Sequence, residues 1–400
     1  MYRAAPYLLA ATTAALLVGG AVGLASADEP ASALARLPDD PQLVWDIRVD
    51  EAQWAVGDDE FVYIASPSTT GGDTLVTVWD RDTGASRSRF TAQTPEGDSP
   101  EFSAIVNGVL LDERCTYGEV ISCELVASDV TDSRVLWKDD TAEVQVGLVG
   151  NEVALGSESS FQLIDPRTGA AEGRIVGDSV SYDNLRSVVT VENSGVVEAF
   201  RLPDLDNPVA AATLPSDTSV YALVGDDLVV GDGRDLSVSD GDELRLLRRF
   251  DFDIAYLEAG SDEIVLVSTV GVTADDGSDD ETVALADLHS SQGRRLWSRS
   301  VAYVGVVHGK TGSAIFQFNV ETVPFLDQWS GNAIVASAAG YWRFGADGLL
   351  LVERERVRAF DYMQQNIVWT LSSVSESSNV SLIDRGVVVL DTDGRARLYQ

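Results

Sequence analysis

Short apolar stretches separated by turns rich in glycine and aspartate run through the chain from Trp45 to Gln400. Val, Ile, Leu and aromatic residues dominate these stretches, and polar residues alternate with them in many places. No long helical period competes with this pattern. The pattern therefore predicts an all-β chain of short strands joined by tight turns.

One unit recurs along these strands. A strand ends in Asp, a turn contains Thr-Gly or Ser-Gly, and a second strand often ends in Trp. The Asp–Gly copies are Asp80 with Gly84, Asp165 with Gly169 and Asp327 with Gly331; the Asp–Trp copies are Asp129 with Trp137, Asp361 with Trp369 and, more loosely, Asp287 with Trp297. Asp accepts hydrogen bonds from turn amides, Gly permits positive φ, and Trp packs between neighbouring sheets.

The repeat length is about 40 residues, which suits four strands in each sheet of a propeller. The fold class is therefore all-β: a single β-propeller of about eight (seven to nine) four-stranded blades over residues 43–400. Nine candidate third strands can be found, but propellers usually have four to eight blades. We therefore expect one weak segment, within Val301 to Ser337, to be an irregular insertion.

The two ends of this region complement each other. The last strands, Val387–Leu390 and Ala396–Gln400, stop one strand short of a complete blade, and Leu43–Ile47 can supply that strand. Trp45 would then be the terminal Trp of the final blade, and the ring would have no exposed edge there. The alternative is an unrelated leader strand.

The combination of apolar strands, Asp, Thr-Gly and terminal Trp resembles the repeat of pyrroloquinoline-quinone-type (PQQ-like) propellers, over most of the chain after residue 43. That family includes quinoprotein dehydrogenases and the BamB-type outer-membrane assembly lipoprotein. The enzymes typically carry adjacent cysteines near the cofactor, and this chain has no Cys-Cys pair and no C-x-x-C-H haem motif. The resemblance thus implies the fold, while PQQ is not expected as a cofactor.

Charge limits the partners. The chain has 64 acidic and 28 basic residues and a formal net charge of −36. Such a field repels phosphate backbones, so nucleic-acid binding is not expected, and it attracts cations or basic protein surfaces.

The N-terminal residues predict export. Arg3 precedes an uncharged stretch from Ala4 to Ala27, and Ala25-Ser26-Ala27 has the form of a cleavage site. Residues 1–27 are predicted to be a signal peptide, with an uncleaved membrane anchor through residues 4–27 as the alternative, and residues 28–42 a linker. The predicted location is extracytoplasmic, either secreted or anchored to the cytoplasmic membrane. No Cys follows the apolar stretch to accept a lipid.

Cys115 and Cys123 are the two cysteines, and their spacing suits facing strands of a hairpin. A disulfide is favoured in an oxidising compartment, two unpaired thiols are the alternative, and two thiols without a nearby His are too few for a zinc site.

Few residues suggest catalysis. His289, in a predicted polar turn, and His308 are the two imidazoles of the chain, and neither lies in a nucleophile motif. One acidic loop offers oxygen ligands for Ca²⁺, with a solvated inter-strand loop as the alternative; its carboxylates are Asp275, Asp276, Asp279, Asp280 and Glu281. Trp54, Trp329 and Trp342 are expected to pack in the core or between blades.

The sequence therefore favours a monomeric, non-enzymatic binding platform or assembly scaffold in the cell envelope, with a protein partner, no catalytic residue and no cofactor. The alternative is an exported carbohydrate-active lyase or hydrolase that uses carboxylates at the propeller axis.

Overall fold

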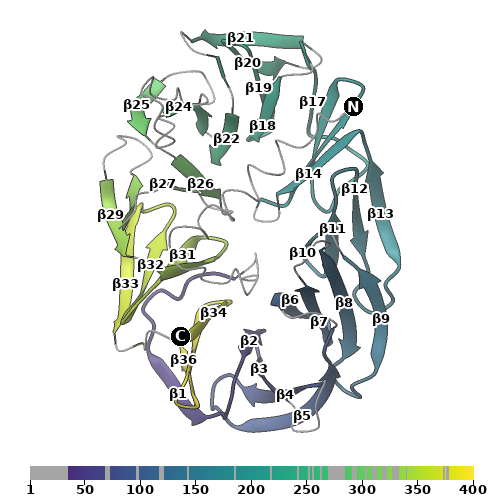
Figure 1. Cartoon of the computed structure of the whole chain (residues 1–400), viewed down its shortest axis with the longest axis vertical. Helices are drawn as coiled ribbons and strands as arrows, with labels where there is room; N and C mark the ends of the chain where they lie inside the picture. The colour runs from purple at the N-terminus through teal and green to yellow at the C-terminus, as the bar shows by residue number, and fades with distance from the viewer. Residues whose placement is uncertain are drawn as a thin grey trace. The chain divides into compact units, whose positions relative to one another are not determined.

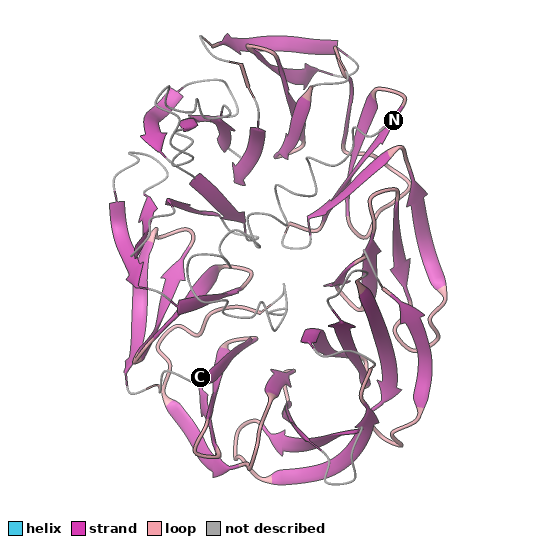
Figure 2. Ribbon diagram, in the orientation of Figure 1, coloured by secondary structure: helices cyan, strands magenta, loops and turns pink. Residues whose placement is uncertain are grey.

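The computed structural model describes residues 35–400 apart from 68–72, 96–98, 117–120, 142–143, 184–185, 217–218, 241–242, 251–252, 255, 262–263, 269–283, 291–294, 302–303, 309–312, 318–321, 327–332, 339, 373 and 375–377. The described residues form strands, turns and loops without a helix (Figure 2). Among them there is accordingly no helix with the length and apolarity needed to cross a bilayer. The predicted signal segment and acidic loop lie outside the described residues.

The protein is an all-β propeller of four-stranded antiparallel sheets, so the predicted fold class is confirmed (Figure 1). The described strands form nine such sheets, at the upper end of the predicted range. In eight of them the strands follow chain order, and in the ninth a strand from the N-terminal side joins the last three strands of the chain.

The sheets divide between two compact units. The first unit contains the described parts of residues 1–174, 340–361 and 367–400. Its sheets are β2 (Trp54–Gly57), β3 (Phe61–Pro67), β4 (Asp73–Asp80) and β5 (Ser86–Gln93); β6 (Ser99–Val106), β7 (Val109–Thr116), β8 (Ser122–Asp129) and β9 (Val135–Asp140); β10 (Gln145–Val149), β11 (Glu152–Gly156), β12 (Ser160–Ile164) and β13 (Ala171–Val176); β30 (Gly340–Phe344), β31 (Gly348–Glu353), β32 (Arg356–Asp361) and β33 (Asn366–Ser372); and β34 (Asn379–Ile383), β35 (Gly386–Asp391) and β36 (Arg395–Tyr399) with β1 (Leu43–Arg48).

The second unit contains the described parts of residues 175–339 and 362–366. Its sheets are β14 (Ser179–Asp183), β15 (Val188–Asn193), β16 (Val196–Arg201) and β17 (Ala210–Thr213); β18 (Val220–Val224), β19 (Asp227–Asp232), β20 (Asp235–Asp240) and β21 (Glu243–Arg249); β22 (Tyr256–Ser261), β23 (Ile264–Ser268), β24 (Ala284–Ser290) and β25 (Arg295–Val301); and β26 (Val304–His308), β27 (Ser313–Gln317), β28 (Thr322–Leu326) and β29 (Ala333–Ala338).

The burial of each strand matches the apolar or polar character of its sequence. The middle strands lie between neighbouring sheets, and β31 is buried at every position. Outer strands such as β5 are mostly exposed, which matches their polar sequences. The core of the first unit consists of apolar clusters between adjacent sheets; one of them includes Leu111, Leu125, Leu148 and Leu155 of the β6–β9 and β10–β13 sheets.

The N-terminal strand completes the C-terminal sheet, as predicted. β1 pairs antiparallel with β36, with Trp45 opposite Leu398 and Ile47 opposite Ala396. The indole of Trp45 is 6% exposed, and its Nε1–H donates to the carbonyl oxygen of Arg81 at 2.9 Å. β1 thus joins β36 by a β-ladder, and the indole of its Trp45 reaches the next sheet.

The Asp–Gly turn and the Trp of the repeat fit together between adjacent sheets. Asp80 Oδ1 accepts hydrogen bonds from the backbone N–H of Thr83 at 2.9 Å and from its hydroxyl at 2.6 Å. These bonds and the side chain of Arg87 lower the pKa of Asp80 to about 2. Gly84 has φ +65°, and a Cβ there would lie 2.7 Å from Cγ of Trp45. The glycine is therefore required both by the turn and by the indole that lies on it.

Two more indoles make similar links. The Trp137 indole donates to the Pro166 carbonyl at 2.8 Å, and a Cβ on Gly169 would lie 2.9 Å from this ring. The Trp369 indole donates to the Pro38 carbonyl at 2.7 Å.

Two expectations differ from the structure. The segment within Val301–Ser337 is not an irregular insertion, because β26–β29 form a complete sheet in which Ile315 pairs with Leu326 and Phe316 with Phe325. The sequence predicts His289 in a polar turn, but the residue lies in β24, paired with Val265 of β23. In the first of these segments Ile315, Phe316, Phe325 and Leu326 are buried, which explains why β27 and β28 form part of a sheet.

Residues 35–42, which the sequence assigns to the linker, lie against the first unit. The backbone N–H of Leu37 donates to Asp347 Oδ1 at 2.9 Å, and the guanidinium of Arg36 binds the carboxylate of Asp384 at 3.0 Å. Ala35 is 1% exposed and belongs to the apolar cluster between the β30–β33 sheet and the C-terminal sheet.

Candidate functional site

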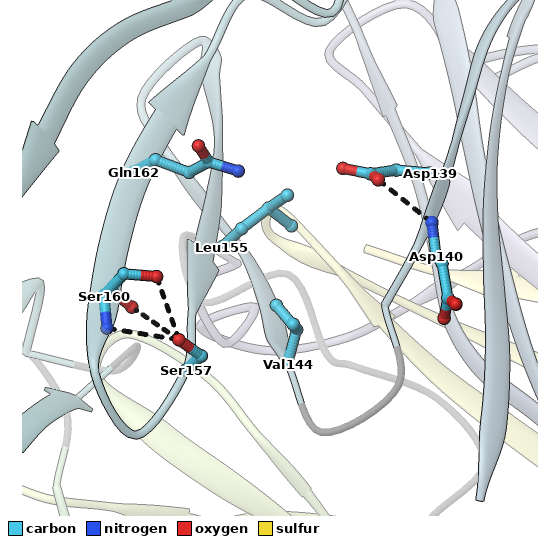
Figure 3. Close-up of a pocket in the computed structure, with 7 residues that line it drawn as sticks. All are labelled: Asp139, Asp140, Val144, Leu155, Ser157, Ser160 and Gln162. Atoms are coloured by element: carbon cyan, nitrogen blue, oxygen red, sulfur yellow. Dashed lines mark hydrogen bonds between the residues drawn. The ribbon is translucent and has the colours of Figure 1, made fainter.

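A pocket of about 180 Å³ lies between the β6–β9 and β10–β13 sheets (Figure 3). Its lining comes from the end of β9, from the segment between β9 and β10, and from β11, β12 and the turn that joins them. The residues are Asp139, Asp140, Val144, Leu155, Ser157, Ser160 and Gln162.

One wall of the pocket is acidic. Asp139 and Asp140 end β9 and are exposed, as expected for an outer strand. The carboxylate of Asp139 accepts the backbone N–H of Asp140 at 3.0 Å. Figure 3 shows the Asp139 carboxylate and the Gln162 amide pointing toward each other from opposite walls, with Leu155 between them. A carboxylate and an amide thus face the same space.

The hydroxyl groups of the other wall largely bond to each other. The Ser157 hydroxyl donates to the Ser160 carbonyl at 3.2 Å and accepts the Ser160 backbone N–H at 3.1 Å. The two hydroxyl oxygens are 2.9 Å apart. This serine turn fixes the rim of the pocket and leaves few donors that point into it.

The floor is apolar. Leu155 is 4% exposed and belongs to the apolar cluster between the two sheets, and the partly buried Val144 packs against that cluster. The pocket therefore combines an apolar floor with carboxylate, amide and hydroxyl groups at its mouth.

The two walls are tied together close to the pocket. Trp137 precedes Asp139 by two residues in β9, and its indole binds the Pro166 carbonyl of the adjacent sheet. Arg167 Nη1 also donates to Asp129 Oδ2 at 2.7 Å. The backbone N–H of Thr131 and the guanidinium of Arg167 lower the pKa of Asp129 to about 2, so this link stays charged over most of the pH range.

Two buried acids of the β6–β9 sheet lie outside the pocket lining. Asp112 is 2% exposed, its Oδ1 accepts the Ser103 hydroxyl at 2.8 Å, and its Oδ2 is 3.9 Å from Arg114 Nε. Burial raises the pKa of Asp112 to about 6. Glu113 is also buried and accepts a hydrogen bond from the Thr141 hydroxyl.

The predicted disulfide is confirmed. Cys115 of β7 and Cys123 of β8 are directly opposite each other, with a Cα–Cα distance of 4.1 Å, and their sulfur atoms are bonded. A Glu113 carboxylate oxygen and the two sulfur atoms lie within 4.8 Å of one another. Because metals bind thiolates, this group offers no thiolate ligand while the disulfide is intact.

The other predicted residues do not meet in this pocket. Asp80, Gly84, Asp165, Gly169, Trp45 and Trp369 lie in the turns and between the sheets described above. Asp287 is in β24 and Trp297 in β25, where Leu288 pairs with Trp297, and His308 ends β26. The Ca²⁺ candidates at 275–281 and the repeat residues Asp327 and Gly331 lie outside the described residues, as does Trp329.

Trp54 is 1% exposed, and the Trp342 ring packs edge-on against Phe344 with ring centroids 6.3 Å apart. The pocket residues are not among those predicted from the sequence, although Asp139 and Asp140 form a pair of acids close after the repeat residue Trp137.

Fold and site together define a β-propeller with an acidic pocket between two adjacent blades. No family model matches the chain, and no curated protein matches it. Solved structures similar to it include BamB from Moraxella catarrhalis, with 14% identity, coverage of 90% of this chain and 99% of that chain, and a TM-score of 0.39.

A eukaryotic initiation factor is similar at 11% identity, covering 85% of this chain and 90% of that chain, with a TM-score of 0.42. Hsv2p from Kluyveromyces lactis is similar at 10% identity, covering 67% of this chain and 94% of that chain, with a TM-score of 0.37. These likenesses are of fold alone.

Proposed function

We propose that the chain is a non-enzymatic, extracytoplasmic binding platform or assembly scaffold for a protein partner in the cell envelope. The observation that carries this proposal is the pocket between the β6–β9 and β10–β13 sheets. Its walls are fixed to each other by Trp137 and Arg167, and its polar groups surround an apolar floor. A preformed concave site with a few placed polar groups is suited to binding.

The carboxyl group of Asp112, in the same sheet, is not placed for catalysis. The pKa of Asp112 is raised to about 6, in the range useful for acid–base chemistry, but the side chain is 2% exposed and hydrogen-bonded to Ser103 inside its own sheet. A general acid must reach the proton that it transfers. Asp112 has the pKa of such a group without the access.

Export and repeat type belong to the same proposal. The uncharged stretch from Ala4 to Ala27 and the Ala25-Ser26-Ala27 site support export, by a cleaved signal peptide or with an N-terminal anchor. The Cys115–Cys123 disulfide is consistent with an oxidising compartment. The contacts of Trp45 with Gly84 and of Trp137 with Gly169 support a PQQ-like repeat.

Site-specific photo-crosslinking tests the platform. A photo-reactive residue replaces Gln162 at the pocket, and in a matched control it replaces Arg48, whose side chain is 81% exposed on β1 of the same unit. We expect a discrete crosslinked partner from intact cells at Gln162 and not at Arg48. The same adducts at both positions, or none at Gln162, would contradict a platform at this site.

Protease treatment of spheroplasts tests the location. An extracytoplasmic protein is digested while the spheroplast membrane is intact, whereas protection until lysis would refute export.

A further inference from the structure

We propose that the pocket binds a basic side chain, the ammonium group of a lysine or the guanidinium group of an arginine, presented by the protein partner. This inference rests on the proposed function and names the chemistry that its site recognises. Three observations carry it: the presence of Asp139 where the other sheet contacts of this unit have an apolar residue, the carboxylate at the mouth of the pocket, and the size and apolar floor of the cavity.

The repeat provides an internal comparison. The position two residues after the inter-sheet Trp is Ile47 after Trp45, Leu371 after Trp369 and Asp139 after Trp137. Leu371 is 9% exposed within an apolar cluster, and Ile47 packs against another. At these two junctions the side chain fills the space between sheets. At the third position the residue is Asp139, whose carboxylate is exposed, and the pocket lies beside it.

The mouth carries one charged acceptor, the Asp139 carboxylate, opposite the neutral amide of Gln162. The hydrogen bond from the Asp140 backbone uses one of about four lone-pair sites on the Asp139 carboxylate. The hydroxyls of the serine turn bond chiefly to each other. Lys138, the base nearest along the strand, points to the opposite face of β9 and binds Glu124 at 2.9 Å. A carboxylate at the mouth selects a ligand that donates hydrogen bonds, and the net charge of −36 favours one that is cationic.

The cavity fits one side chain. Its volume is about 180 Å³, whereas pockets for drug-sized ligands hold roughly 300–1,000 Å³. The aliphatic stem of Lys or Arg would lie on Leu155 and Val144 while its charged group remains at the polar mouth, which is the usual arrangement for such side chains.

Calorimetric or NMR titration of the purified mature chain tests the inference without any partner. The ligands are N-acetyl-arginine amide and N-acetyl-lysine amide, compared with the neutral isostere N-acetyl-citrulline amide. We expect both basic ligands to bind at least tenfold more tightly than citrulline. Equal binding of citrulline, preferential binding of a saccharide, or no binding of either basic ligand would overturn the inference.

Variants separate the pocket from general attraction to an acidic protein. Asp139→Asn is expected to weaken binding at least tenfold, whereas Asp393→Asn removes the same charge from an exposed turn and should leave affinity unchanged. Asp139→Leu, which restores the apolar residue of the other junctions, should abolish binding and raise the melting temperature. Equal effects of Asp139→Asn and Asp393→Asn would refute the assignment.

A negative result in the ligand titration can be distinguished from a negative result in the crosslinking experiment. If the basic ligands do not bind but Gln162 still crosslinks to a partner, the recognition chemistry is wrong and the platform stands. If they bind in the pocket but nothing crosslinks there, the platform is wrong.

Discussion

Asp112→Asn removes a negative charge that the folded protein holds away from water. The carboxyl is 2% exposed, accepts one hydrogen bond from Ser103 and has Arg114 Nε at 3.9 Å. Asn keeps the size of the side chain and the oxygen that accepts the Ser103 hydroxyl. The substitution therefore tests the charge more than the packing.

The magnitude follows from the pKa. Burial raises the pKa of Asp112 from 3.8 to about 6 in the folded state. The folded state then binds a proton more tightly than the unfolded state, so stability falls as pH rises between these values. At about 1.4 kcal/mol for each tenfold change in proton affinity, the cost reaches about 3 kcal/mol above pH 6, and roughly half of it is present at about pH 5.

Urea unfolding of both proteins at about pH 5 and about pH 8 measures this effect. The stability of Asp112→Asn relative to wild type should rise by about 1 kcal/mol between the two pH values. The difference at a single pH also contains the loss of the Arg114 ion pair, so the change with pH is the test. Asp227→Asn, at an exposed position, is the control. A relative stability of Asp112→Asn that is the same at both pH values would refute the raised pKa.

Three further predictions concern the links that hold the sheets. Gly84→Ala should lose more stability in thermal unfolding than Gly150→Ala: both glycines have positive φ, which costs about 1–2 kcal/mol for Ala, but the added Cβ meets an indole only at Gly84. Equal losses of stability in the two variants would contradict this prediction, because they would mean that the Trp45 indole moves aside for the added Cβ. Trp45→Phe should cost about 1–3 kcal/mol in urea unfolding, because a buried carbonyl loses its donor; a change below about 0.5 kcal/mol would contradict this. Replacing Cys115 and Cys123 together by Ala should cost about 2–3 kcal/mol from the loop that they close, and an unchanged denaturation midpoint would contradict that value.

The propeller could be predicted because its repeat is encoded locally. Asp80, Gly84 and the intervening turn interact within a few residues, so their pattern is visible in the sequence. The missing strand of the last sheet was equally visible, since the pairing of β1 with β36 needs a strand of suitable length with Trp45 in place.

Contacts between distant segments were not visible. Arg36 binds Asp384, which is 348 residues away. A single ion pair of this kind leaves no repeated pattern in the sequence. The second unit also links two sheets without Trp: Arg201 of β16 donates to Asp226 at 2.9 Å and to the Gly225 carbonyl at 2.7 Å. A pattern based on the repeat Trp therefore does not predict these contacts.

The pocket was missed for a related reason. Asp139 ends an outer strand and Gln162 lies in a middle strand of the next sheet, so their approach depends on how the two sheets pack. Each residue alone has an ordinary explanation, as a solvated strand end or as a polar position between turns. The departure from the repeat at Asp139 becomes informative once Ile47 and Leu371 are seen to pack between sheets.

The contact between two adjacent sheets therefore serves both the fold and the proposed binding site. Trp137 and Gly169 set the separation of the two sheets, as Trp45 and Gly84 do elsewhere in the unit. With that separation fixed, the residue two positions after the Trp decides whether the space is filled by an apolar side chain or left open beside a carboxylate. The pocket of the first unit thus lies beside two links between its sheets, the indole of Trp137 and the guanidinium of Arg167, and a cation that binds there would meet walls already held in place.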